Sequence, residues 1–302
     1  ADLSADFRLR DPATYERFEK VVLIHGVRRT SELAYRDYIE HDIASHEFFG
    51  EWVREHMDDV RAAAESTTRV GKLHEVRQYG IGPLRYLRFN YTTGDAAGQN
   101  MATIDADAIC RYIEIHAPIA CRHWFVESNL SGDKKATHQS LVGVRGRKVS
   151  AEVVLPPSLV AERLHTTVDA MLDYWRMSVV GGVMSGSVGV QGHYANGLAA
   201  MFIACGQDAA CVAEAATGIT RFEPSGDGGL YAAVTLPSVI VGTVGGGTGL
   251  PSQHACLDIM RVAGAGHAGA FAEIVAAVAL AGELSITGAL AAAGYTPDQI
   301  DV

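Results

Sequence analysis

The residues best suited to chemistry lie in two segments, A-C-G-Q-D-A-A at Ala204–Ala210 and V-G-T-V-G-G-G-T-G-L at Val241–Leu250. Asp208 stands among small and apolar neighbours, where a carboxylate is costly to bury without a partner. The three consecutive glycines of the second segment let a backbone approach a ligand where any side chain would block it. One segment offers a titratable group and the other offers close backbone access, so together they predict an active site.

A lysine is a natural partner for Asp208. The run N-L-S-G-D-K-K at Asn129–Lys135 places an acid beside two bases. It predicts either a solvated turn or a lysine that stabilises a developing oxyanion and donates a proton. A carboxylate paired with a remote lysine shifts both pKa values, whereas an unpaired Asp208 would only cap a helix. The small neighbours of Asp208 favour the paired arrangement.

Two further segments suit an anionic ligand. T-G-D-A-A-G-Q-N-M at Thr93–Met101 is a loop that enters a helix, and free N–H groups there suit a phosphate, although it lacks the Rossmann G-x-G-x-x-G pattern. Arg69 follows three hydroxyl residues and suits a phosphate monoester, with a solvated arginine as the alternative. His193 and Asn196 are either a polar pair that faces a ligand or a structural histidine and its neighbour.

Composition excludes several classes of protein. With 302 residues and 48% hydrophobic content, the chain is long enough for a sizeable core that divides into two subdomains. The net charge of −10 argues against nucleic acid as a partner. The five cysteines contain no C-x-x-C and the twelve histidines no H-E-x-x-H, so we expect a reduced, cytoplasmic protein without a metal. Ala268–Gly294 is apolar but contains two glutamates, and it predicts a buried core helix rather than a membrane span.

Periodicity predicts which elements position these residues. The first half reads helix, strand, strand, helix, strand over about 80 residues, an order that suits a small α+β subdomain of ferredoxin-like type. Its expected elements are a helix over Phe48–Ser66, strands over Val70–Val76 and Leu84–Phe89, a helix over Gln99–Ile115 and a strand over Ala120–Glu127. The second half is expected to have strands over Val149–Leu155, Gly229–Pro237 and Val239–Val244, and helices over Pro157–Arg176, His193–Cys205, Pro251–Val262 and Ala268–Ala292.

Taken together, the motifs resemble the catalytic portion of the 3-hydroxy-3-methylglutaryl-CoA reductase family, and most closely its archaeal and eukaryotic class. The resemblance runs from about His46 to Ala293, and the order and spacing of the motifs match the family. The segments that carry it are A-E-S-T-T-R-V-G-K-L (Ala64–Leu73), R-F-N-Y-T-T-G-D-A-A-G-Q-N-M (Arg88–Met101), D-K-K (Asp133–Lys135), G-R-K-V-S-A-E-V-V-L-P (Gly146–Pro156), I-A-C-G-Q-D-A-A (Ile203–Ala210), G-T-V-G-G-G-T (Gly242–Thr248) and A-G-E-L-S (Ala281–Ser285).

The resemblance implies an α/β fold with an inserted α+β ferredoxin-like subdomain that binds NADP(H), in an intertwined homodimer with active sites at the subunit interface. It divides the chain into an N-terminal helical segment of the large domain (1–45), the inserted subdomain (46–126) and the large catalytic domain (127–302). The implied partners are a small-molecule substrate, for which a CoA thioester is one candidate, and a second copy of the chain, without nucleic acid or membrane.

The resemblance also implies roles for single residues. Lys134 would be the catalytic lysine that stabilises the oxyanion, and Asp208 its carboxylate partner. Glu16, in A-T-Y-E, is the candidate for the proton-donating glutamate, with a surface helical glutamate as the alternative. The implied substrate-binding residues are Asp133, Lys135, Arg176, His193 and Asn196. The implied cofactor-binding residues are Thr68 and Arg69 at the 2′-phosphate, then Asp95, Gly98, Gln99, Asn100, Gly245, Gly246, Gly247 and Thr248.

The acyl-thioester half departs from the family pattern. No histidine follows His267, the stretch before the insert is short, and Glu127 stands where a small serine is usual. We therefore expect an NADP(H)-dependent oxidoreductase that acts on an acyl-CoA or carbonyl substrate. Two alternatives stay open at this point. One is a non-redox lyase, isomerase or cyclase on the same scaffold, and the other is a non-catalytic partner subunit.

Overall fold

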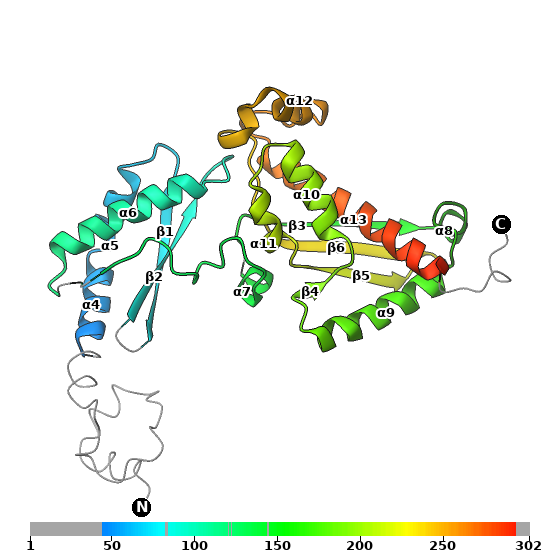
Figure 1. Ribbon diagram of the computed structural model, residues 1–302, viewed down its shortest axis with the longest axis horizontal. Coiled ribbons are helices and arrows are strands. Elements are labelled where there is room, and N and C mark those ends of the chain that lie inside the picture. Colours follow the sequence, from blue (N-terminus) through cyan, green and yellow to red (C-terminus); the bar gives the residue numbers. More distant parts are fainter. Residues whose placement is uncertain (1–43, 82–83, 120, 122, 144, 294–302) are drawn as a thin grey trace, which may run out of the picture.

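The computed structural model describes residues 44–293, apart from 82–83, 120, 122 and 144. Figure 1 shows two units, one built around the hairpin β1–β2 and the other around a larger sheet, with an irregular segment running between them after α6. The predicted residue Glu16 and the proposed segment 1–45, except for its last two residues, lie outside the described part.

The first unit packs three helices against an antiparallel hairpin. Helices α4 (Ala44–Glu55) and α5 (Met57–Glu65) replace the single expected helix, and strands β1 (Lys72–Ile81) and β2 (Leu84–Thr92) confirm the expected hairpin. Helix α6 (Gln99–His116) confirms the helix expected over Gln99–Ile115. The hydrophobic cluster of this unit consists of Trp52, Val53, Val60, Ala64, Leu73, Ile109 and Ile113.

The strand expected at 120–127 is wrong at the positions that the structure describes, which are irregular. An extended segment becomes a strand only where a neighbouring edge supplies its hydrogen bonds. This segment instead crosses from the first unit to the short helix α7 (His138–Val142) (Figure 1). The first unit therefore has a two-stranded sheet in the described residues.

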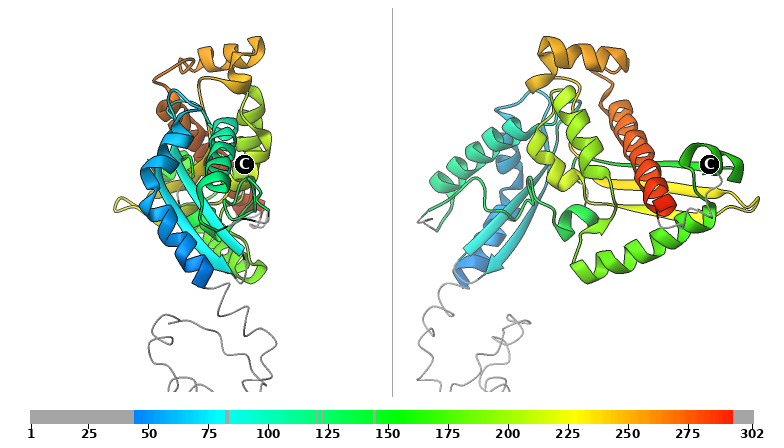
Figure 2. Two further views of the ribbon diagram at one scale, coloured as in Figure 1. Left: turned by 90° about the vertical axis from the view of Figure 1, so that its left-hand side faces the viewer. Right: turned by 45° about the vertical axis from the view of Figure 1, so that its right-hand side comes forward.

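The second unit is a four-stranded sheet covered by helices, which confirms the expected α/β class. The strand order is β3 (Arg147–Leu155), β6 (Leu230–Val239), β5 (Gly218–Pro224) and β4 (Gly189–Val190), antiparallel except for β4 beside β5. Figure 2 shows α13 lying along this sheet. The helices are α8 (Pro157–Leu164), α9 (Val168–Ser185), α10 (Tyr194–Ala204), α11 (Val212–Ala215), α12 (Pro251–Ile259) and α13 (Ala268–Ala293).

Two sequence expectations for this unit are wrong. The helix expected over Pro157–Arg176 is two helices, because His165 takes a left-handed backbone with φ of 53° and the Thr167 hydroxyl caps α9 by accepting the Ala170 N–H. The strand expected over Val239–Val244 is also wrong, since the chain leaves the sheet at Val239. It then approaches the loop that precedes α6, where the Thr243 N–H donates to the Asp95 carbonyl.

Helix α13 fills the core, as the sequence indicates. Within the described residues it is long and apolar enough to cross a membrane by length and composition, with a mean hydropathy of 1.9. Its side chains Phe271, Val275 and Ala279 are nevertheless buried in one cluster with the sheet and α10. This packing is that of a core helix.

Candidate functional site

Lys134 and Asp208 form an ion pair between two loops that are 74 positions apart in the sequence. Lys134 Nζ lies 3.0 Å from Asp208 Oδ2, and both side chains are partly exposed. Asp208 begins the short 3₁₀ helix η3 (Ala209–Cys211), and its Oδ1 accepts the Ala210 N–H at 3.0 Å. Partial burial opposes ionisation of Asp208, but Lys134 and that N–H together hold its pKa below the ordinary value. The Asp208 carboxylate in turn raises the pKa of Lys134.

A buried ion-pair network lies under this pair. Glu214, on α11, is fully buried, and its Oε1 accepts the backbone N–H of Lys134 at 3.0 Å and a hydrogen bond from Arg145. Arg145 also contacts Asp133 Oδ1 at 2.6 Å. Burial opposes the charge on Arg145, but the Glu214 and Asp133 carboxylates raise its pKa above the usual value.

The same network includes a group that resembles a metal site. Asp133, Cys211 and Glu214 each place one donor atom within 4.8 Å of the others. Arg145 already forms an ion pair with each of the two carboxylates, and burial raises the pKa of the Cys211 thiol to about 12, which disfavours the thiolate that a metal needs. In the described part of the chain this group therefore works as an ion-pair network.

The segments Ala204–Ala210 and Val241–Leu250 are in direct contact. A Cβ added at Gly206 would lie 2.4 Å from the carbonyl carbon and oxygen of Gly247, so both positions need glycine for the loops to meet. Gly245 and Gly246 face open space, while Thr248 is buried and its hydroxyl donates to the Gly245 carbonyl at 2.7 Å. Gly246–Gly249 forms the short 3₁₀ helix η4.

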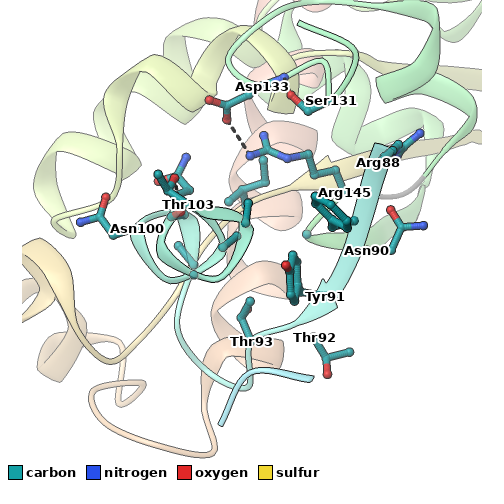
Figure 3. Close-up of a pocket in the computed structure, with 18 of the residues that line it drawn as sticks. Arg88, Asn90, Tyr91, Thr92, Thr93, Asn100, Thr103, Ser131, Asp133 and Arg145 are labelled. Atoms are coloured by element: carbon teal, nitrogen blue, oxygen red, sulfur yellow. Dashed lines mark hydrogen bonds and ion pairs between the residues drawn. The ribbon is translucent and has the colours of Figure 1, made fainter. Parts of the chain in front are cut away.

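A cleft of about 1070 Å³ opens beside Lys134. Its walls are β2, the Thr93–Gly98 loop, the first turns of α6 and the segment around Arg145. In Figure 3, Arg145 points at Asp133, and Asn100 and Thr103 lie on α6. Cationic side chains outnumber acidic ones along this cleft. They are Arg77, Arg88, Lys134, Arg145 and Arg147, against Asp95, Glu127 and Asp133. An acidic chain therefore presents a basic cleft, which suits an anionic ligand.

The cofactor candidates of the first unit divide into two places. Gly98, Gln99 and Asn100 line the cleft at the start of α6, where Gly98 has φ of 78° and no side chain caps the helix. Asp95 also lines the cleft, but its carboxylate accepts the N–H groups of Gly266 and Ala268 at the start of α13. Thr68 and Arg69 lie off the cleft lining. The Thr68 hydroxyl accepts the Gly71 N–H, and Arg69 is exposed.

The structure does not bring most substrate candidates to Lys134. Lys135 is exposed, and its Nζ donates to the Asp133 carbonyl at 3.0 Å. Arg176 is exposed on α9 and pairs with Asp173. His193 and Asn196 lie at the beginning of α10, whereas Asp208 follows its end, and the helix is about 16 Å long. Within one chain, the side chains of His193 and Asn196 therefore lie far from the Lys134–Asp208 pair.

Three residues that hydrogen-bond to candidate residues were not predicted from the sequence. Arg145 and Glu214 are separated by 69 positions, and no local pattern marks a glutamate that binds a distant backbone N–H. Glu283 is 2% exposed and accepts the Gly192 and His193 N–H groups at the start of α10, as well as the Thr220 hydroxyl. A charged residue in the middle of an apolar helix was a signal for Glu283, since such a residue needs a partner when it is buried.

Comparisons with known proteins found a matching family model and similar relatives. Residues 27–296 match the family model described as hydroxymethylglutaryl-coenzyme A reductase. A 3-hydroxy-3-methylglutaryl-coenzyme A reductase of Haloferax volcanii is 45% identical over 83% of this chain, and one of Pyrococcus horikoshii is 44% identical over 80%. The matched parts span 63% and 60% of those relatives' own lengths.

A solved structure agrees on the fold. The class II 3-hydroxy-3-methylglutaryl-CoA reductase of Streptococcus pneumoniae, bound to NADPH in open conformations, superposes with a TM-score of 0.61. It is 18% identical, and the match covers 86% of this chain and 63% of that one.

Proposed function

The chain belongs to the hydroxymethylglutaryl-coenzyme A reductase family, and on that premise we propose that it is the catalytic region of an NADP(H)-dependent reductase of a CoA thioester or related carbonyl compound. The 3.0 Å contact between Lys134 Nζ and Asp208 Oδ2, beside a basic cleft, carries the proposal. The reductase names of the relatives favour this activity over a lyase, an isomerase, a cyclase or a non-catalytic partner subunit.

The residues around the cleft fit a dinucleotide phosphate. The uncapped first turn of α6 offers N–H groups at Gln99 and Asn100, and the arginines of the cleft supply positive charge. Open space at Gly245 and Gly246 leaves room for close backbone contact. NADPH, when bound, supplies the hydride. We propose that Thr68 and Arg69 extend this site toward the 2′-phosphate, and that residues 46–126 act as a ferredoxin-like cofactor subdomain inserted into the large domain of 127–302.

Lys134 would do the chemical work at the substrate. Its ammonium, kept charged by Asp208, donates a hydrogen bond to the carbonyl oxygen as negative charge develops there. A preorganised donor of this kind is worth about 3–4 kcal/mol of transition-state stabilisation. Glu16 stays the proposed proton donor, and Asp133 and Lys135 the proposed neighbours of the acyl group.

A second copy of the chain would complete the site. One chain leaves His193 and Asn196 away from Lys134. The exposed face of α9 carries four large apolar side chains whose coverage a homodimer explains. They are Met177 (68% exposed), Val180 (60%), Val183 (78%) and Met184 (83%).

The activity is tested by titrating the protein with NADPH and by following NADPH oxidation with hydroxymethylglutaryl-CoA. We expect saturable binding in both the wild type and Lys134→Ala, and a kcat about 10²- to 10³-fold lower in the variant. Absence of saturable NADPH binding would refute the proposal.

The dimer is tested by mixing two inactive variants, Lys134→Ala and His193→Ala. If each site takes Lys134 from one copy and His193 from the other, mixed dimers contain one intact site and regain up to about half of the wild-type activity. Sedimentation measures the oligomeric state in parallel. A monomer, or a mixture with no regain of activity, would contradict shared sites.

A further inference from the structure

Lys134 has a backbone conformation that is unfavourable for a lysine. Its φ is 58°, in the left-handed region that favours glycine, asparagine and aspartate. A residue stays in this region only where its surroundings hold it there. The conformation decides the direction in which the side chain leaves the backbone. The contacts that hold the Lys134 backbone in this conformation therefore also determine where its Nζ atom lies.

Glu214 is the group that holds this backbone. Its Oε1 accepts the Lys134 N–H at 3.0 Å, and its side chain is fully buried, so water does not compete for the bond. Arg145 donates to the same oxygen and to Asp133, the residue before Lys134. Arg145 is itself anchored, because its backbone N–H donates to Ser238 Oγ at 3.2 Å.

We propose that Glu214, held by Arg145, is the positioning residue for the catalytic lysine. Asp208 and Glu214 lie on one short stretch made of η3 and α11. Asp208 binds the side-chain end of Lys134 and Glu214 binds its main-chain end. One segment thus holds the lysine at two points, its backbone N–H and its ammonium group. The hydrogen bond from the Lys134 N–H to Glu214 is termed the grip. The catalytic consequence rests on the proposed function, whereas the grip itself does not.

The grip has a direct spectroscopic readout, because the chain contains only five lysines. Labelling with ¹⁵N-lysine gives at most one backbone amide signal for each, and Lys134→Arg removes and so assigns the signal of Lys134. Hydrogen exchange is then measured in the full chain. We expect Glu214→Ala to speed exchange of the Lys134 amide at least about tenfold. Glu214→Gln keeps an acceptor oxygen without the charge, so it should give a smaller increase.

The same variants separate positioning from binding. Displacement of the lysine by a fraction of an ångström lowers the rate of the chemical step and leaves the affinity for the cofactor unchanged. For Glu214→Gln we expect kcat to fall about 10- to 100-fold while the KM for NADPH stays within about twofold. Glu152→Gln, at an exposed carboxylate that accepts the Tyr231 hydroxyl across β3 and β6, is the matched control and should leave both readouts unchanged.

If Glu214→Ala does not fold, Arg145→Lys takes its place. A lysine keeps the charge but cannot reach two carboxylates with a planar fork, so the Lys134 amide should again exchange faster and kcat should fall. Unchanged exchange of the Lys134 amide in the variants that fold overturns the grip. Faster exchange with an unchanged kcat overturns the positioning role. A wild type that never oxidises NADPH refutes the proposed function instead, and the exchange result then decides the grip alone.

Discussion

Gln207 and Gly242 form a reciprocal pair, in which the Gly242 N–H donates to Gln207 Oε1 at 2.8 Å and Gln207 Nε2 donates to the Gly242 carbonyl at 3.0 Å. The Gln207 side chain thus binds both the N–H and the carbonyl of Gly242, as a neighbouring β-strand would. One residue earlier, Gly206 packs against Gly247. The segment that carries Asp208 and the glycine-rich loop are therefore fastened at two successive positions, and they form one structural element.

Gly206→Ala should break this contact. The new Cβ would lie 2.4 Å from the Gly247 carbonyl, and φ at Gly206 is 68°, so the backbone would be strained as well. We expect a loss of about 2–4 kcal/mol in the free energy of unfolding, measured by urea denaturation. Gly249→Ala is the control, since its Cβ would meet open space and its φ is not positive. Equal effects of the two variants would contradict the close-contact explanation.

The ion pair predicts the pH dependence of the reaction. The Asp208 pKa is lowered and the Lys134 pKa is raised, so the charged pair exists throughout the neutral range. The rate of the chemical step should then be flat there, with an alkaline limb above the ordinary lysine value of about 10.4.

Asp208→Asn tests this dependence. Removing the carboxylate removes the group that favours the ammonium, so the pKa of Lys134 falls and the alkaline limb moves to lower pH. The measurement is kcat against pH in single-turnover reactions, which isolate the chemical step. An alkaline limb at the same pH in both proteins would show that Lys134 does not titrate in this step.

Asp95 links the two units and contributes to stability above its own pKa. The backbone N–H groups of Gly266 and Ala268 hold the pKa of its carboxyl below the ordinary value. A carboxyl with a lowered folded-state pKa stabilises the fold above the unfolded value near 3.8, and this stability is lost as the pH falls through the folded value.

Asp95→Asn keeps an oxygen that can accept these N–H groups but removes the charge, so it should lower the free energy of unfolding at pH 7, and this deficit should shrink as the pH falls through the folded-state pKa of Asp95. Urea denaturation at several pH values measures this difference. Asp107→Asn, which removes the partner of Arg111 on the surface of α6, is the control. A deficit that is constant across this pH range would argue that the charge on Asp95 has no role.

The sequence predicted most of the individual helices and strands, but not the contacts between residues far apart in the chain. The hairpin, α6, α10 and α13 follow from periodicity and turn residues, so their expected positions are confirmed. Helix α9 continues through Gly181 and Gly182, which disfavour helix, and so it extends beyond Arg176, where the sequence expectation ended. Strand β5, in which exposed and buried residues alternate, was not among the expected strands.

The same distinction applies to the candidate site. The motifs around Lys134 and Asp208 pointed to a pair, and the two atoms meet at 3.0 Å. The grip of Glu214 on the Lys134 N–H has no signature in the sequence, because any residue but proline supplies that donor. The sequence alone likewise does not show that His193 and Asp208 lie apart. The structure shows it, because the helix α10 separates them.

Burial predicts which thiols react with an alkylating agent. The pKa values of Cys110 and Cys205 are raised to about 11 and that of Cys211 to about 12, in each case chiefly by burial. Cys121 is exposed. Under native conditions near pH 8, iodoacetamide should modify Cys121 well before these three, since the thiolate is the nucleophile. Mass spectrometry of a time course checks the order. Early modification of Cys211 would show that the region around Lys134 opens in solution.

The position of the nucleotide phosphates can be decided by comparing two arginines. Arg88 lines the cleft, whereas Arg69 is exposed and lies off its lining, although the family resemblance assigns Arg69 to the 2′-phosphate. If Arg69 binds that group, Arg69→Ala should weaken NADPH binding about 10- to 100-fold and leave NADH binding unchanged, because a charge-assisted hydrogen bond is worth about 1.5–3 kcal/mol. If Arg88 contacts the phosphates common to both nucleotides, Arg88→Ala should weaken both equally. Fluorescence titration of both variants with both nucleotides distinguishes these cases. Loss of NADPH selectivity in Arg88→Ala alone would indicate that the 2′-phosphate binds in the cleft and not at Arg69.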